Sequence, residues 1–141
     1  MDARQLGQHT SHRFDDDLEA IRQKLLAAGG LVENQLKDAL AALANFDKGM
    51  GEHVVSSDEG VNDLEVEIDQ LCMEVIARRQ PMASDLRLLI AAIKIINDLE
   101  RMGDEAVRIA RMAIRLTERE SSDGRQFEVR ARVRGPRGLP P

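Results

Sequence analysis

The stretch Ser84–Leu116, SDLRLLIAAIKIINDLERMGDEAVRIARMAIRL, decides the fold. At about 100° per residue its apolar side chains gather along one face of a single long helix. Glu100 and Asp104 fall within about 20° of the centre of this face. Two carboxylates on an inward face cost free energy unless something compensates them, so they are the main indication of a functional site. The apolar residues of the face are Leu86, Leu89, Ile90, Ile93, Ile96, Val107, Ala110 and Ile114.

The composition indicates one modest helical domain. The chain has 141 residues, 2% aromatic residues, no Trp or Tyr and only four Pro, which argues against a sheet and against a surface that stacks nucleic-acid bases. Residues 117–141 contain six Arg and four acids, which leaves 14 basic and 21 acidic residues in 1–116, a net charge of −7. This charge favours cations or basic partner surfaces. Because the sequence has neither an apolar run long enough for a membrane span nor a signal-peptide core, it predicts a cytoplasmic protein.

Two further helices precede this stretch. The first runs from about Phe14 to Asn45, and its apolar stripe keeps its phase across Gly29-Gly30. The second covers about Lys48 to Arg79 and ends at Gln80-Pro81, since a residue before proline avoids helical torsions. Three helices of about 30 residues with short connections predict an all-α fold, an elongated antiparallel three-helix bundle.

The two ends of the chain lack this periodicity. Residues 1–12 are predicted to be a flexible leader, residues 13–116 the bundle, and residues 117–141 a disordered Arg/Pro-rich tail. The abrupt change in composition after Leu116 is also what a truncated or frame-altered gene would produce.

Two helices contain the same pattern, Glu-x-x-x-Asp, as Glu65 to Asp69 and as Glu100 to Asp104. A spacing of four residues puts both carboxylates on one side of a helix, so two adjacent helices offer four carboxylates to one cation or a small cluster. Such an all-oxygen set suits Mg²⁺, Mn²⁺, Ca²⁺ or iron better than a closed zinc site. Asp58 and Asn62 precede Glu65 and Asp69 at spacings of four and three residues, which places them along the same side of the second helix. They are second-tier candidates.

Other interpretations of these residues remain open. Glu-x-x-x-Asp is a weak motif, Asp104 has Arg108 one turn further on as an ion-pair partner, and acids along a groove could simply be solvated. Cys72 lies in the apolar stripe and is predicted to be a buried, inert thiol. The three histidines, His9, His12 and His53, have no catalytic partners at suitable spacing, and there is no Gly-rich phosphate loop, so the sequence does not predict an enzyme.

The run from about His12 to Leu116 resembles one repeat of the PhoU family, regulators of bacterial phosphate uptake and phosphate signalling. The segments that carry the resemblance are FDDDLEAIRQKLLAAGGLVENQL and DLEVEIDQLCMEVIARRQPMASDLRLLIAAIKIINDLERMGDEAVRIA. The second is long and specific, above all in RQPMASDLR and NDLERMGDEAVRIA.

The resemblance implies a three-helix bundle whose metal-binding motifs fall on Glu65, Asp69, Glu100 and Asp104, with iron, manganese, magnesium or zinc as the divalent or ferric ion. It also implies two partners, the ATPase of the phosphate ABC transporter and the phosphate-sensing histidine kinase, and a negative regulatory role when phosphate is ample. PhoU-family proteins usually carry two such repeats, whereas this sequence contains the first alone. A homodimer could replace the second repeat. The alternatives are a metal-free structural oligomerising bundle and a non-functional truncated PhoU.

Overall fold

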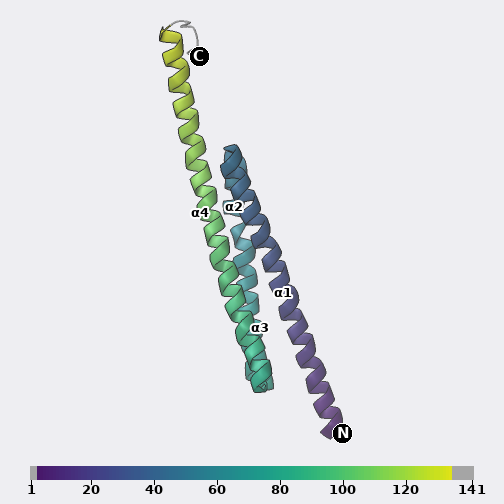
Figure 1. Ribbon diagram of the computed structural model, residues 1–141. Helices are drawn as coiled ribbons and strands as arrows, with labels where there is room; N and C mark the ends of the chain where they lie inside the picture. The colour runs from purple at the N-terminus through teal and green to yellow at the C-terminus, as the bar shows by residue number, and fades with distance from the viewer. Residues whose placement is uncertain (1–2, 135–141) are drawn as a thin grey trace.

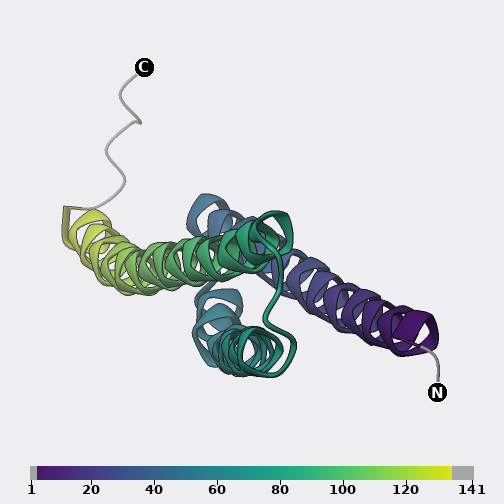
Figure 2. The ribbon, with the colours of Figure 1, turned by 90° about the horizontal axis from the view of Figure 1, so that it is seen from below.

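The computed structural model describes the backbone of residues 3–134 and the side chains of residues 13–122. Four helices follow one another: α1 (Ala3–Asn45), α2 (Lys48–Ser56), α3 (Asp58–Arg79) and α4 (Ala83–Arg134). In Figure 1, α1 and α4 run in the same direction, while α2 and α3 together form the returning arm. Seen along the bundle in Figure 2, these three arms lie side by side. The predicted all-α three-helix bundle is therefore confirmed, and no strand occurs within residues 3–134.

The core is a seam in which buried positions alternate at spacings of three and four residues. On α4 these positions carry Leu89, Ala92, Ile96, Leu99, Gly103, Ala106, Ala110 and Ala113, of which Leu99 is half-buried and the others are buried. Such a seven-residue repeat keeps one side of each helix facing its neighbours along the whole bundle. The core has two clusters, called lower and upper after their places in Figure 1. The lower cluster, near the start of α4, is rich in large side chains, including Ile21, Ile68, Leu89 and Ile96. The upper cluster contains Ala39, Val54, Ala106 and Ala110.

Local signals in the sequence end and restart the helices. Phe46 takes a left-handed conformation (φ 53°), and the Asp47 N–H donates to the Ala42 carbonyl at 3.0 Å, which closes the end of α1. The Asp47 carboxylate then accepts a hydrogen bond from the Met50 N–H at 3.1 Å and caps α2. Gln80 is also left-handed (φ 42°) and precedes Pro81, so α3 stops there as predicted.

The predicted single helix across Lys48–Arg79 is divided at Ser57. The Ser57 N–H donates to the carbonyls of His53 and Val54, and its hydroxyl donates to the Val54 carbonyl at 2.8 Å. A serine hydroxyl that bonds back to the chain competes with regular helical bonding. The turn at Ser57 is tight enough to keep α2 and α3 in one arm (Figure 1), but it starts α3 at Asp58.

The helices extend beyond the predicted ends at about Phe14 and at Leu116. Helix α1 begins at Ala3, inside the predicted leader, and α4 continues to Arg134, well into the predicted tail. An apolar stripe indicates only where a helix packs against its neighbours, whereas helix formation also depends on the propensity of each residue. Residues 117–134 contain no proline, so the helix can continue through them. Residues 1–2 and 135–141 lie outside the described residues, so the remainder of the predicted leader and tail is untested.

Among the described residues, no helix is both long enough and apolar enough to cross a lipid bilayer.

Candidate acidic site

A polar layer interrupts the apolar seam between the two core clusters. Gln35 on α1 is 4% exposed, and its amide nitrogen donates to the Asp58 carboxylate and to the Ser57 hydroxyl, both at 3.4 Å. Asp58 follows Gly51 and Val54 along the inward side of the α2–α3 arm and is half-buried. The break at Ser57 therefore places the first acid of α3 against a buried amide of α1.

Gly103 makes room for this layer. A Cβ atom on Gly103 would lie 3.1 Å from Gln35 Oε1 and 3.3 Å from Asp58 Oδ1. The Gln35 and Asp58 side chains thus occupy the space that a larger residue would fill on α4. Gln35 Oε1 is buried and accepts no hydrogen bond from the described residues, which leaves this layer with an unused acceptor.

The charges of the predicted site residues interact between α3 and α4 through Glu65, Glu100 and Asp104. Burial raises the pKa of Glu65, and the negative charges of Asp69 and Asp104 raise it further. Burial also raises the pKa of Glu100, with additional contributions from the charges of Asp104 and Glu65, a hydrogen bond with Asp104 and the charge of Asp58. Two helices have therefore brought like charges together, which costs free energy in the absence of a cation.

The predicted central position of Glu100 and Asp104 was wrong. Glu100 is half-buried, and Asp104 is exposed at the edge of the seam. The predicted apolar face included residues such as Ile93 and Val107 that fall outside the seven-residue repeat of α4, and these shifted its apparent centre. The small residues Ala92, Gly103 and Ala106 mark the true seam, but they carry little hydrophobic weight in a helical projection.

The acidic residues of the site make no ion pairs with the described side chains. Arg108, the predicted alternative partner of Asp104, instead contacts Glu105 at 3.2 Å. Within residues 13–122, no cation forms an ion pair with Asp58, Glu65, Asp69, Glu100 or Asp104. The arginine-paired interpretation therefore does not account for the cluster.

Not all candidate ligands are equally well placed. Glu65, Asp69 and Asp58 are half-buried, and Asn62 is exposed. One carboxylate oxygen of Asp69, Oδ1, is buried without a hydrogen-bond partner. In the part of the chain whose side chains are described, no three Asp, Glu, His or Cys side chains converge as they would around a metal ion.

The remaining candidate reactive groups of the sequence are one cysteine and three histidines. Cys72 is buried in the lower core, where burial, together with the charge of Asp69, raises the pKa of its thiol to about 11. The predicted inert thiol agrees with this environment, because a thiol is the unreactive form. His53 is exposed, whereas the side chains of His9 and His12 lie outside the described residues.

The polar layer contains two residues that the sequence interpretation missed, Gln35 and Gly103. Both fall on the seven-residue repeat, Gln35 between Val32 and Ala39 on α1 and Gly103 between Ile96 and Ala110 on α4. Following the seven-residue repeat along each helix, rather than the apolar residues alone, would have identified both positions. Their partner Asp58 was a second-tier candidate, and its contact with Gln35 depends on the break at Ser57.

We expect the Glu100→Gln substitution to stabilise the metal-free protein near neutral pH. The pKa of Glu100 is raised in the folded state, so the stability gained by its protonation is present at low pH and lost as the pH rises through that pKa. Removing one charge of a like-charged pair four residues apart should raise the free energy of unfolding by about 0.5 kcal/mol. Urea unfolding in EDTA should reveal this gain at about pH 7 and its absence at about pH 3.5, where the wild-type carboxyl is protonated as well.

The matched control is Glu105→Gln, which removes an exposed carboxylate that pairs with Arg108. It should give no gain at either pH. A Glu100→Gln protein no more stable than wild type at neutral pH would contradict the proposed repulsion.

Comparison with known proteins identifies what the bundle is similar to. A family model described as the PhoU domain matches residues 25–113. The chain is 50% identical over 125 residues to a phosphate-specific transport system accessory protein PhoU homolog of Pseudomonas putida, covering 89% of this chain and 49% of the relative. It is 46% identical over 114 residues to the phosphate-specific transport system accessory protein PhoU of Escherichia coli strain K12, covering 81% of this chain and 47% of the relative.

A solved structure gives the same result. The crystal structure of PhoU from Pseudomonas aeruginosa matches with a TM-score of 0.74 and 50% sequence identity, covering 75% of this chain and 51% of that one. The chain spans about half the length of the curated relatives it matches.

Proposed function

The chain belongs to the PhoU family, and we propose that it regulates phosphate uptake and phosphate-regulon signalling through contacts with other proteins. The observation that carries this proposal is the close similarity to accessory proteins of the phosphate-specific transport system across most of the chain. The matched region includes the whole acidic cluster, from Asp58 to Asp104. The proposed role is negative: the protein restrains signalling when phosphate is ample, and it catalyses no reaction.

The proposed partners are the ATPase of the phosphate ABC transporter and the phosphate-sensing histidine kinase. We propose that the protein binds them in the cytoplasm. The names of the relatives support the first, since an accessory protein acts together with a transport system. We further propose that the chain forms a homodimer. Large apolar side chains remain exposed on all three arms, which supports association. Examples are Leu26 on α1, Met73 on α3 and Leu88 on α4.

We also propose that the acidic cluster holds a divalent or ferric metal ion through Glu65, Asp69, Glu100 and Asp104, with Asp58 and Asn62 as second-tier ligands. Three observations support the fit: the donors are all oxygen atoms, their like charges lack paired cations, and Asp69 Oδ1 is buried without a partner. A bound cation would supply the positive charge that these carboxylates lack. The chain's own part is to hold the four acids on the facing sides of α3 and α4, with Gln35 fixing Asp58 beside them.

One observation favours a second candidate, a metal-free oligomerising bundle. No three potential ligands converge among the described side chains, so the acids could remain solvated while the exposed apolar residues mediate assembly. The two candidates make different predictions for metal content.

A paired measurement of metal content and repression tests the proposal. We expect the purified wild-type protein to contain a divalent or ferric metal in native mass spectrometry, and the Glu100→Gln/Asp104→Asn variant to lose most of it. In a bacterium without its own PhoU, grown in phosphate-rich medium, the wild-type chain should lower expression of a phosphate-regulon reporter several-fold. The variant should do so less well, because its site lacks two ligands.

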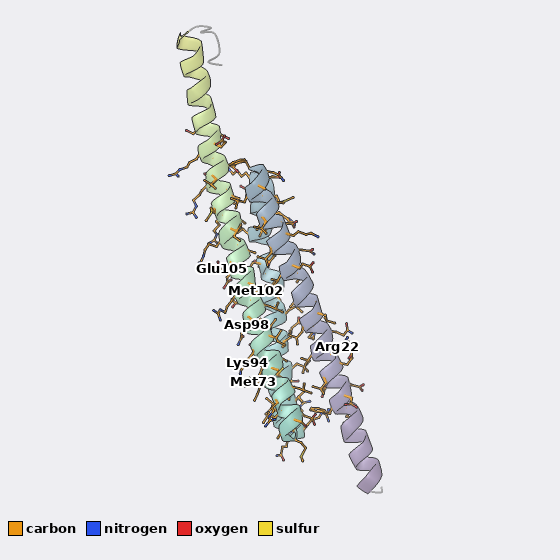
Figure 3. The ribbon with its side chains drawn as sticks, in the orientation of Figure 1. Arg22, Met73, Lys94, Asp98, Met102 and Glu105 are labelled. Atoms are coloured by element: carbon orange, nitrogen blue, oxygen red, sulfur yellow. The ribbon has the colours of Figure 1, made fainter. Side chains whose placement is uncertain are left out.

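The Asp98→Asn/Glu105→Gln variant is the matched control. It removes the same two kinds of charge from the outer face of α4, where Figure 3 labels both residues and each pairs with an arginine. This control should keep its metal and its repression. Metal retained by the site variant would overturn the assignment of the ligands, whereas a wild-type chain without repression would overturn the regulatory role.

A further inference from the structure

A groove of about 720 Å³ runs along the middle of α4, beside the start of α3. Its lower end is acidic and formed by Asp58 and Asp104. Above them, the apolar lining is formed by the half-buried Ile114 and by the small exposed part of Val107, which is 9% exposed. The groove thus begins at the acidic cluster and leads away from it along the helix.

Three arginines line the groove above its acidic end: Arg108, Arg111 and Arg115. Arg108 contacts Glu105, but both side chains are more than half exposed, so this pair is weak. Neither Arg111 nor Arg115 is in an ion pair with any other side chain of residues 13–122. These two guanidinium groups are therefore available to a ligand. They form a local positive patch on a protein whose residues 1–116 carry a net charge of −7.

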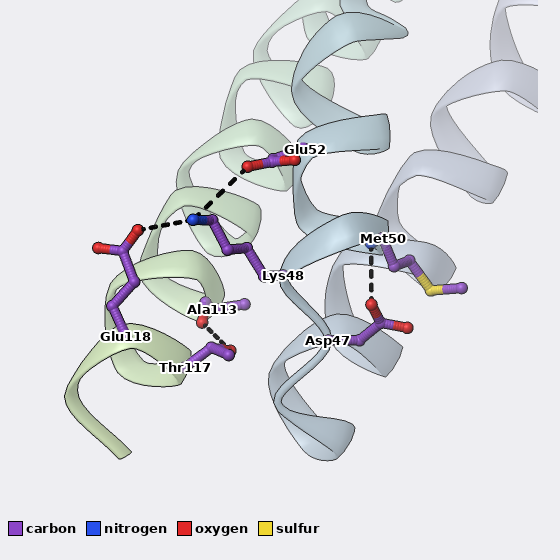
Figure 4. Close-up of polar contacts among 7 residues, drawn as sticks. All are labelled: Asp47, Lys48, Met50, Glu52, Ala113, Thr117 and Glu118. Atoms are coloured by element: carbon purple, nitrogen blue, oxygen red, sulfur yellow. Dashed lines mark hydrogen bonds and ion pairs between the residues drawn. The ribbon is translucent and has the colours of Figure 1, made fainter. Parts of the chain in front are cut away.

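Helix α2 borders the upper part of this region. Lys48 at the start of α2 bridges Glu118 of α4 at 3.1 Å and lies 4.0 Å from Glu52 (Figure 4). Glu118 lies seven residues beyond Arg111, on the same side of α4. Arg115 also borders a second hollow, whose lining includes Leu116, Glu118 and Arg119. Cationic and apolar side chains therefore continue up α4, where the acidic Glu118 is paired with Lys48.

We propose that this groove docks an acidic amphipathic helical segment of another protein. Its carboxylates would contact Arg111 and Arg115, since arginine binds carboxylates through two parallel hydrogen bonds, and its apolar side chains would cover Val107 and Ile114. From Arg108 to Arg115 is about 10 Å along the helix, the length of two turns of such a segment.

The charge of the groove also specifies the orientation of the segment. Asp58 and Asp104 at the lower end repel acidic groups, so the acids of the segment belong at its upper end and a neutral or basic residue at its lower end. This asymmetry disfavours a uniformly anionic partner, such as a nucleic acid or an anionic lipid surface. The groove itself is exposed and open, which suits a protein segment better than an enclosed small molecule.

A labelled peptide tests the proposal in EDTA, so that the result does not depend on the metal site. The probe is a fluorescein-labelled helical peptide of about 14 residues, with Leu at positions i, i+3 and i+7, Glu beside them and Lys at the end predicted to meet Asp104. Fluorescence anisotropy should show micromolar binding to the wild-type protein. The Arg111→Glu/Arg115→Glu variant should weaken binding at least about tenfold, because it replaces attraction with repulsion at both contacts.

The control variant, Arg87→Glu/Arg101→Glu, makes the same charge change on exposed residues of α4 that do not line the groove. It should change the affinity by less than about twofold. The Arg111→Gln/Arg115→Gln variant, which introduces no new charge, should give an intermediate loss and guards against a folding defect. Equal weakening by both double charge reversals, no binding of the peptide to the wild-type protein, or tighter binding of phosphatidylglycerol vesicles than of the peptide would each overturn the proposal.

Discussion

The Leu89→Ala substitution is expected to lower the free energy of unfolding by about 2–5 kcal/mol, the range for a leucine removed from a close-packed core. Leu89 has no exposed surface and lies in the lower core with Ile96, Ile68 and Cys72. Three long arms meet there, so neighbouring side chains cannot collapse into the space without moving a helix. Chemical denaturation followed by circular dichroism would measure the loss.

Leu88 is the matched control, because it is the same residue type in the adjacent position on the same helix. It is 56% exposed, so Leu88→Ala should change the free energy of unfolding by no more than about 0.5 kcal/mol. Equal losses at the two positions would mean that the seven-residue seam does not define the buried side of α4. That result would also undermine the placement of the acidic site, which depends on the same register.

The Gly103→Leu substitution should destabilise the bundle by about 2–4 kcal/mol, the sum of overpacking and of lost hydrogen bonds. A Cβ atom at this position already approaches Gln35 Oε1 and Asp58 Oδ1 closely. A full leucine side chain would displace both and break the bonds that Gln35 donates to Asp58 and Ser57. The gain in helix propensity over glycine, about 1 kcal/mol, does not offset this cost. Thermal unfolding would detect the change as a lower Tm.

The same change at Gly30 provides the comparison. Gly30 lies inside α1, and a Cβ atom added there would have no neighbour within 4 Å, so Gly30→Leu should raise stability by up to about 1 kcal/mol through helix propensity alone. A Gly103→Leu protein that unfolds at or above the wild-type temperature would show that the polar layer is not closely packed. Opposite signs at the two glycines would confirm that contact, rather than backbone freedom, decides the effect.

Much of the architecture followed from the sequence because it rests on local physics. Apolar periodicity indicated three helical arms, and Gln80-Pro81 marked the end of α3. The spacing of four residues placed Glu65 with Asp69, and Glu100 with Asp104, on one side of their helices. The resemblance to the PhoU family was confirmed over the same stretch that carried these motifs.

Other features required the neighbouring helices. The stripe of α4 was centred too close to Glu100 and Asp104, because a helical projection gives the same weight to flanking residues such as Ile93 as to seam residues. Which flank is covered depends on where the other arms pack, and small residues such as Gly103 determine how closely they approach. The apolar stripe of α4 ends at Leu116, but the helix continues to Arg134. Backbone hydrogen bonds can continue where side chains no longer pack against another helix.

The sequence by itself therefore determined the helical arms and the pairs of acids within each helix, because both depend on residues three or four positions apart. The tertiary structure alone decided that Gln35 meets Asp58 across Gly103, that Glu65 of α3 lies near enough to Glu100 of α4 for their charges to interact, and that Arg108 contacts Glu105 rather than Asp104. These relations depend on the relative rotation of the packed arms, which is fixed by the summed packing of the whole seam and is not encoded in any single local pattern.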